Sequence, residues 1–331
     1  MRLFDCTLRD GANVVGKGFD ARLTKMMIEG LIKSGITTIE MGNALGLGAY
    51  EANGAIAPLT DEEYLQLIQP YLDQAEIGMF MGFKNASQEN IDLAAKYGLK
   101  FLRVGANAGD GAGAVEGIKR VKAAGIKCYF SVMKGYILSP DELAKEAVML
   151  EEAGLDAITI MDSAGFMDPD MVKEYITKLS AAVKIPVGFH GHSNLGMSTA
   201  NAIAAVQSGA EIIDCGLLGM ARSAGNCSTE LVAFALDKKG YLPKEVKLYD
   251  LLDFLDAELI PAMAEHDYRT AVTPNDLIYG YAGCHSSFSK TLEAVAAEKG
   301  VHLYKLIVEV SKIDQKAPSR ELMEKVAESI K

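Results

Sequence analysis

The chain has 331 residues, of which 49% are hydrophobic and 23% charged, and its formal net charge is -11. This acidic balance, without a Lys/Arg-rich block, argues against binding to nucleic acid or to an anionic membrane surface. The apolar content is sufficient for one large barrel with an appendage, or for two ordinary domains.

The N-terminal segment and the cysteines favour a cytoplasmic protein. No basic segment followed by an apolar stretch opens the chain, so we predict no signal peptide. No window approaches the ~18 uninterrupted apolar residues that a membrane span needs. The five cysteines show no CxxC spacing, which predicts reduced and mostly buried thiols.

Short β-branched or apolar runs alternate with helical patterns up to about residue 245. Residues 23–35 and 139–154 have apolar residues at helical spacing, and the second stretch begins with a capping box formed by Ser139 and Glu142. The apolar runs, which we predict to be β-strands, are residues 2–8, 37–42, 76–82, 101–105, 127–133, 157–162, 187–192 and 211–216.

Many of these helical patterns end in a glycine just before the next strand, as in AGI (124–126) and AGL (153–155). The phrase recurs at roughly 25–35 residues, the length of a βα unit. Eight such units predict an α/β protein with a closed (β/α)₈ TIM barrel over residues 1–243. An open doubly wound sheet is disfavoured because no GxGxxG follows the first strand.

After about residue 245 only helical patterns remain, and no strand pattern separates them. We therefore predict a C-terminal all-helical domain over residues 244–331. Since no Ser/Pro-rich linker precedes it, we expect this domain to pack on the barrel. The predicted helices are residues 248–267, 286–300, 303–313 and 319–331.

Polar side chains lie at or near the carboxyl ends of the predicted strands, where TIM barrels carry their active sites. They include an adjacent cation and carboxylate after the first strand, and two histidines at the end of the seventh. In chain order, the residues are Arg9, Asp10, Glu40, Asn43, Arg103, Lys134, Asp162, Ser163, His190, His192, Asn194 and Asp214.

The strongest local signal is HGH within FHGHSNLG (189–196). Two imidazoles at i and i+2 on a strand point to the same side. With the Asp10 carboxylate they offer three ligands and leave positions open for water and substrate, as a catalytic divalent site requires. We therefore predict a metal site at Asp10, His190 and His192. The alternative is that one histidine is a hydrogen-bonded structural residue.

Arg9 is adjacent to Asp10, so we expect its side chain to point in a different direction. A guanidinium beside a metal can bind a carboxylate or stabilise a developing enolate oxygen. The alternative is a buried ion pair, with Glu40 as the partner. Lys134 could form a Schiff base, but a strand-end lysine more commonly pairs with a carboxylate.

Three stretches in this order, TLRDG (7–11), FHGHSNLG (189–196) and GLLGMARSAGN (216–226), resemble the DRE-TIM metallolyase superfamily. Its members include hydroxymethylglutaryl-CoA lyase, several 2-oxo acid synthases and the 4-hydroxy-2-oxovalerate aldolases. EMGNALGLG (40–48) and GYAGCHSSF (280–288) are most similar to the aldolase branch.

The resemblance implies a carbon–carbon lyase that cleaves or forms a 4-hydroxy-2-oxo acid from pyruvate and an aldehyde. It implies that Asp10, His190 and His192 bind Mn²⁺, Mg²⁺ or Co²⁺. It also implies that Arg9 stabilises the pyruvate enolate. The expected substrate-binding residues are Arg9, Ser163 and Asn194.

Two positions differ from the aldolase pattern. Asn13 stands where the RDGxH motif of these aldolases carries the catalytic base, and His285 replaces the tyrosine of the tail motif. Asparagine cannot accept and return a proton near pH 7. We therefore predict His285 as the base, with a metal-bound water as the alternative.

Two other functions stay open at this point. One is a Claisen-type condensation of acetyl-CoA with a 2-oxo acid, as in the citramalate and isopropylmalate synthases. In the other, a barrel without its base serves mainly as the partner of an acylating aldehyde dehydrogenase. A homodimer is expected by analogy. The residues do not identify the aldehyde or the metal.

Overall fold

A computed structural model describes residues 1–331 except residues 53, 272 and 285 and the side chains of residues 51, 276, 280 and 286. The chain divides into two compact units, Met1–Val246 and Lys247–Lys331. Within the described residues, no helix combines the length and the apolar character that crossing a membrane requires.

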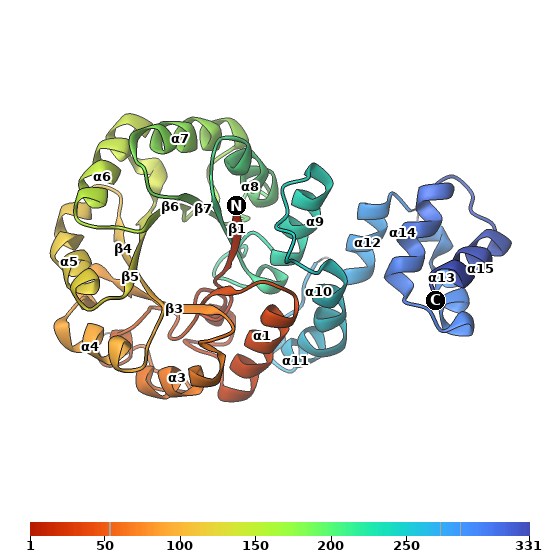
Figure 1. The fold of residues 1–331 in the computed structure, drawn as a ribbon, viewed down its shortest axis with the longest axis horizontal. Helices are drawn as coiled ribbons and strands as arrows, with labels where there is room; N and C mark the ends of the chain where they lie inside the picture. Colours follow the sequence, from red (N-terminus) through yellow and green to blue (C-terminus); the bar gives the residue numbers. More distant parts are fainter. Residues whose placement is uncertain (53, 272, 285) are drawn as a thin grey trace. The chain divides into compact units, whose positions relative to one another are not determined.

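The first unit is a closed barrel of eight parallel strands that follow one another around the ring in chain order (Figure 1). This confirms the predicted (β/α)₈ TIM barrel. The strands are β1 Arg2–Asp5, β2 Thr38–Glu40, β3 Glu76–Gly82, β4 Phe101–Asn107, β5 Lys127–Met133, β6 Ala157–Asp162, β7 Val187–Gly191 and β8 Ile212–Cys215.

The helices between the strands surround the barrel (Figure 1). Ser139 and Glu142 form the predicted capping box at the start of α6, with Pro140 in its first turn. The helices of this unit are α1 Ala21–Lys33, α2 Ala49–Ala52, α3 Asp61–Leu67, α4 Gln88–Lys96, α5 Val115–Ala123, α6 Pro140–Glu152, α7 Pro169–Ala182, α8 Ser198–Gln207 and α9 Thr229–Lys239.

Strand β1 is shorter than predicted, because it ends at Asp5 rather than Leu8. The Asp5 carboxylate accepts a hydrogen bond from the backbone N–H of Thr7 and another from the hydroxyl of Thr229. These bonds turn the chain out of the sheet immediately after Asp5.

The next residues form a tight turn in which the backbone N–H groups of Arg9 and Asp10 both donate to the carbonyl of Cys6. Gly11 follows at a crowded point, since a Cβ there would lie 3.1 Å from Cβ of Met220. Asp10 is therefore held by a packed turn and not by the strand itself.

Inward-facing side chains fill the barrel in layers. One layer is apolar, and its Phe4 and Tyr129 rings lie 5.3 and 4.9 Å from that of Phe101. Because strand side chains alternate between faces, Arg103 and Asp214 occupy the next inward positions on β4 and β8. A charged layer therefore rests on the apolar one, which consists of Phe4, Phe101, Tyr129, Ala157 and Ile212.

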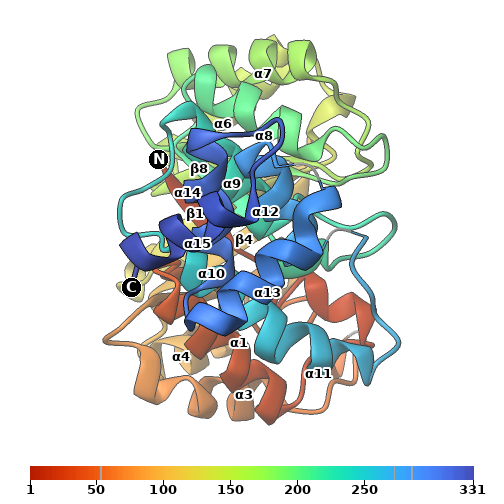
Figure 2. The same ribbon diagram turned by 90° about the vertical axis from the view of Figure 1, so that its right-hand side faces the viewer.

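The second unit contains only helices among its described residues, and its α13 packs against α15 and its α12 against α14 (Figure 2). The four predicted helical stretches are present. A π-helical segment, Leu255–Leu259, interrupts the first, and α12 was not predicted. The α-helices are α10 Leu248–Phe254, α11 Ile260–Ala264, α12 Pro274–Ala282, α13 Ser289–Lys299, α14 Leu303–Ile313 and α15 Arg320–Ser329.

Candidate metal centre

Asp10, His190 and His192 lie together at the carboxyl ends of the barrel strands. One ligand atom from each lies within 4.8 Å of the other two. Oδ2 of Asp10 is 3.7 Å from Nε2 of His190 and 3.8 Å from Nε2 of His192. All three side chains are buried. At this spacing the three side chains could hold a metal ion, and N/N/O is a ligand set that divalent cations accept.

Electrostatics keep two of these side chains ready to act as ligands. Burial alone would raise the pKa of Asp10, but Arg9 and the two imidazoles hold it well below its ordinary range. Burial, together with His190, lowers the pKa of His192 to about 4. At neutral pH Asp10 is therefore a carboxylate and His192 a neutral imidazole, the forms that bind metals.

We expect the His192 imidazole of the metal-free protein to titrate near pH 4. Its folded-state pKa is below the unfolded value of about 6.5. Its contribution to stability is therefore complete above about pH 6.5 and is lost as the pH falls toward 4. An NMR pH titration, with the resonance assigned by His192→Gln, measures the midpoint. A midpoint near that of a free imidazole would contradict this account of the site.

Two asparagines support Asp10. Nδ2 of Asn226 donates to Oδ2 of Asp10 at 3.0 Å, and Nδ2 of Asn13 donates to the Asp10 carbonyl oxygen at 2.9 Å. Oδ1 of Asn226 is buried and has no hydrogen-bond partner among the described residues, so it can serve as a further oxygen ligand. Asn226 was not among the predicted site residues, although its place at the end of GMARSAGN (219–226), after the last strand, was a usable signal.

The prediction that Arg9 points away from Asp10 is wrong. Both residues lie in the turn after β1, where strand alternation does not apply, and Nη1 of Arg9 is 3.1 Å from Oδ1 of Asp10. Nε of Arg9 donates to Oε1 of Glu40 at 2.6 Å, so the buried ion pair is present as well. Nη2 of Arg9 is buried without a hydrogen-bond partner among the described residues. This nitrogen can donate to a ligand.

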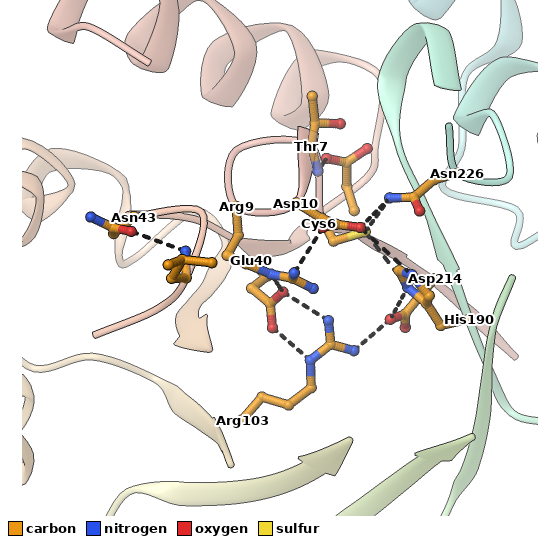
Figure 3. A network of polar contacts seen from close by, with 12 residues as sticks. Cys6, Thr7, Arg9, Asp10, Glu40, Asn43, Arg103, His190, Asp214 and Asn226 are labelled. Atoms are coloured by element: carbon orange, nitrogen blue, oxygen red, sulfur yellow. Dashed lines mark hydrogen bonds and ion pairs between the residues drawn. The ribbon is translucent and has the colours of Figure 1, made fainter. Parts of the chain in front are cut away.

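Arg103 was expected at a strand end, but it lies inside the barrel and is 0% exposed. Its Nε donates to Glu40 and its Nη1 to Asp214, each at 2.5 Å (Figure 3). Burial would raise the pKa of these two carboxyl groups, but Arg103 lowers both. Side chains two positions apart on a strand point to the same face, so the inward direction of Arg103 follows from that of Phe101 on β4.

Nδ1 of His190 lies 3.1 Å from Oδ2 of Asp214. Because a carboxylate only accepts hydrogen bonds, Nδ1 carries the proton and Nε2 presents its lone pair toward Asp10. Asp214 thus selects the tautomer in which His190 can bind a metal on the side of Asp10.

Cys6, His190 and Asp214 also have the spacing of a metal site. This group is a poor cation site, because Asp214 already accepts from Arg103. In addition, burial raises the pKa of the Cys6 thiol well above its ordinary value, which disfavours the thiolate that a metal needs. The site at Asp10 is therefore the better candidate.

The other predicted site residues lie in the loops after β5 to β7. Oγ of Ser163 accepts from the backbone N–H of Lys134 at 2.9 Å, and Nδ2 of Asn194 donates to Oγ of Ser223 at 2.6 Å. Lys134 and Asn194 are exposed. The predicted base, His285, lies outside the described residues.

The fold and the site together define a TIM-barrel protein with a candidate divalent-metal centre at the carboxyl ends of its strands. The HMGL-like family model matches residues 1–257, and the chain belongs to this family. The predicted resemblance is thus confirmed.

Relatives and solved structures agree with this assignment. The chain is 32% identical over 313 residues to a 4-hydroxy-2-oxovalerate aldolase of Carboxydothermus hydrogenoformans, covering 95% of this chain and 92% of that protein. It is 34% identical over 289 residues to the aldolase of the same name from Moorella thermoacetica, covering 87% and 84% of the two chains.

Two solved structures share the fold. The hydroxymethylglutaryl-CoA lyase of Pseudomonas aeruginosa has a TM-score of 0.68 at 15% identity. The match covers 84% of the present chain and 97% of the lyase chain. The carboxyl transferase domain of Rhizobium etli pyruvate carboxylase with pyruvate and biocytin has a TM-score of 0.68 at 15% identity. This match covers 100% of the present chain and 61% of the carboxylase chain. At this identity the two structures support the barrel fold alone.

Proposed function

We propose that this protein is a divalent-metal-dependent aldolase, a carbon–carbon lyase that converts a 4-hydroxy-2-oxo acid to pyruvate and an aldehyde, or the reverse. The observation that carries the proposal is the group of Asp10, His190 and His192, beside which Nη2 of Arg9 has no hydrogen-bond partner among the described residues. The relatives above are named for this reaction type. Their names do not favour the Claisen-type alternative or a purely assembling partner.

Asp10, His190 and His192 would hold the metal, with Oδ1 of Asn226 available as a further ligand. We propose Mn²⁺, Mg²⁺ or Co²⁺, since carboxylate and imidazole ligands accept these ions. Bound there, the ion would act as a Lewis acid that polarises the 2-oxo group and the carboxylate of the substrate.

Cleavage of the C3–C4 bond moves its electrons toward the 2-oxo oxygen while a base removes the proton of the 4-hydroxyl group. Nη2 of Arg9 donates to the 2-oxo oxygen as its negative charge develops. Asp10 and Glu40 already hold the other nitrogens of Arg9, so this donor does not have to reorganise. The enolate then takes a proton at C3 to become pyruvate.

The base is not Asn13, because an amide cannot take up a proton near pH 7 and Asn13 donates to Asp10. We propose His285 for this role on the sequence evidence. We also propose that Ser163 and Asn194 contact the polar groups of the substrate.

Location and assembly are proposals from cysteine chemistry and family resemblance. The five cysteines are buried, and none forms a disulfide within the described residues, which fits a reducing compartment and supports a cytoplasmic location. By analogy with the aldolase branch, we propose a homodimer that works with an acylating aldehyde dehydrogenase. Light scattering tests the dimer.

The direct test incubates Mn²⁺-loaded protein with pyruvate in D₂O and then with a panel of aldehydes. We expect metal-dependent exchange of the pyruvate methyl protons, followed by a product whose mass is the sum of pyruvate and one aldehyde. Absence of exchange and of product would refute the aldolase. Release of CoA from acetyl-CoA with a 2-oxo acid would instead support the condensing enzyme.

The ring of Phe80 packs against the guanidinium group of Arg9. The guanidinium carbon of Arg9 lies 5.0 Å from the centre of the Phe80 ring, and a Cβ on Gly105 would lie 2.3 Å from Cε2 of that ring. We expect Gly105→Ala to displace Phe80 and Arg9 and to lower kcat for methyl exchange by about 10- to 100-fold, with little change in Mn²⁺ affinity.

Gly82→Ala is the matched control for this experiment, because a Cβ on Gly82 would meet nothing within 4 Å. Its kcat should equal that of the unmodified protein. If Gly105→Ala behaved in the same way, the ring of Phe80 would have no part in positioning Arg9.

A further inference from the structure

We propose that Arg103 and Asp214 are positioning residues that link the metal ligand His190 to Arg9, an inference that rests on the proposed function. Neither residue touches the ligand atoms that face the proposed metal. They belong to a closed set of buried polar contacts, called here the charged ring (Figure 3). The charged ring consists of Asp10, Arg9, Glu40, Arg103, Asp214 and His190.

Arg103 contacts two carboxylates at once. Its Nε and Nη2 donate to Oε2 and Oε1 of Glu40 at 2.5 and 2.8 Å, and its Nη1 donates to Oδ2 of Asp214 at 2.5 Å. Its guanidinium carbon also lies 4.3 Å from the centre of the Phe4 ring. The side chain is therefore fixed by three hydrogen bonds and by the apolar layer of the barrel.

Each of the two carboxylates shares one oxygen between Arg103 and a residue of the site. Oε1 of Glu40 accepts from Arg103 and from Nε of Arg9. Oδ2 of Asp214 accepts from Arg103 and from Nδ1 of His190. A displacement of Arg103 would therefore move the anchor of Arg9 and the anchor of His190 together.

The two branches act on different parts of the proposed reaction. The branch through Asp214 orients the His190 imidazole and so determines metal affinity. The branch through Glu40 orients Arg9 and so determines the stabilisation of charge on the substrate oxygen. A change at Asp214 should therefore act first on metal affinity, and a change at Arg103 should act on both quantities.

The first test measures Mn²⁺ affinity by calorimetry. We expect Asp214→Ala to weaken binding by about 10- to 100-fold, the usual effect of removing a hydrogen-bond partner of a metal-bound histidine. Asp214→Asn should recover part of this loss, because its amide oxygen can still accept from His190. Asp156→Ala is the matched control, since it removes a carboxylate that precedes β6 at the other end of the barrel and bonds to Lys122 and to the backbone N–H of Cys128. The Mn²⁺ affinity of this variant should be unchanged.

A second readout needs neither metal nor activity. In the metal-free protein, ¹⁵N NMR of labelled histidine should show the Nδ1–H tautomer of His190. Asp214→Ala should shift His190 toward the Nε2–H tautomer, whereas Asp156→Ala should not. A merely structural role of Asp214 would leave the tautomer as it is in the unmodified protein.

The third variant, Arg103→Lys, keeps the positive charge but cannot make three hydrogen bonds in a fixed plane. We expect it to lower both Mn²⁺ affinity and kcat for pyruvate methyl exchange at saturating Mn²⁺, each by about tenfold or more. Circular dichroism confirms that each variant is folded. If Arg103→Lys folds poorly, the tautomer measurement on Asp214→Ala decides the inference alone.

The inference is overturned if Asp214→Ala retains full Mn²⁺ affinity and the Nδ1–H tautomer, or if folded Arg103→Lys loses neither affinity nor kcat. Failure of the proposed function has a different signature. In that case the unmodified protein itself would bind no Mn²⁺ and exchange no methyl protons of pyruvate.

Discussion

His192→Ala is expected to remove Mn²⁺ from the protein and to lower the rate of pyruvate methyl exchange by about 10²- to 10³-fold. Lewis-acid stabilisation of a developing oxyanion is worth several kcal/mol, and about 1.4 kcal/mol is a factor of ten in rate. Nε2 of His192 faces Asp10 at 3.8 Å, and removal of one of the three proposed carboxylate and imidazole ligands weakens the binding of a divalent ion. Metal content by mass spectrometry and exchange by NMR are the two measurements.

The matched control is His266→Ala, which removes an exposed histidine of the helical unit. Its metal content and exchange rate should equal those of the unmodified protein. Full metal content and full activity in His192→Ala would mean that the three side chains do not form the metal site, and the proposed chemistry would lose its basis.

Arg9→Lys is expected to lower kcat by about 10²- to 10³-fold while Mn²⁺ affinity changes little. Removal of one preorganised donor to a developing oxyanion costs roughly 2.7–4 kcal/mol. Nε of Arg9 donates to Glu40 and Nη1 lies beside Asp10, so Nη2 is the nitrogen that can donate to the substrate. The single ammonium group of a lysine cannot serve all three acceptors in this geometry.

The control for this variant is Arg120→Lys, since Arg120 donates to the carbonyl of Ala86 on the outer side of the barrel. Comparison of kcat at saturating Mn²⁺ and pyruvate separates a loss of catalysis from a loss of binding. An unchanged kcat in Arg9→Lys, with Mn²⁺ bound, would exclude Arg9 as the group that stabilises the developing charge.

Much of this protein could be predicted from local patterns. The eight apolar runs became the eight strands of the barrel, and the capping box at Ser139 begins α6. The motif HGH and the carboxylate of Asp10 were predicted to share one cation, and their ligand atoms do lie within 4.8 Å of one another. Such features are readable because strand period, helix caps and ligand chemistry depend on residues close in sequence.

The direction of Arg9 and the position of Arg103 were not predicted correctly. The end of β1 depends on the hydrogen bond from Thr229 to Asp5, which joins residues 224 positions apart in the chain. Arg103 lies between Glu40 and Asp214, two carboxylates delivered by different strands. Only closure of the barrel brings these groups within hydrogen-bond distance.

Local patterns in the chain thus specify the barrel, its strands and the residue types that can bind a metal. The partners of these residues follow only from the folded chain: Asp214 contacts His190, Glu40 contacts Arg9, and Arg103 lies between the two carboxylates. A buried charge is stable only where the fold supplies opposite charges and hydrogen-bond partners. Inside a closed barrel, those partners come from strands that are distant in the chain.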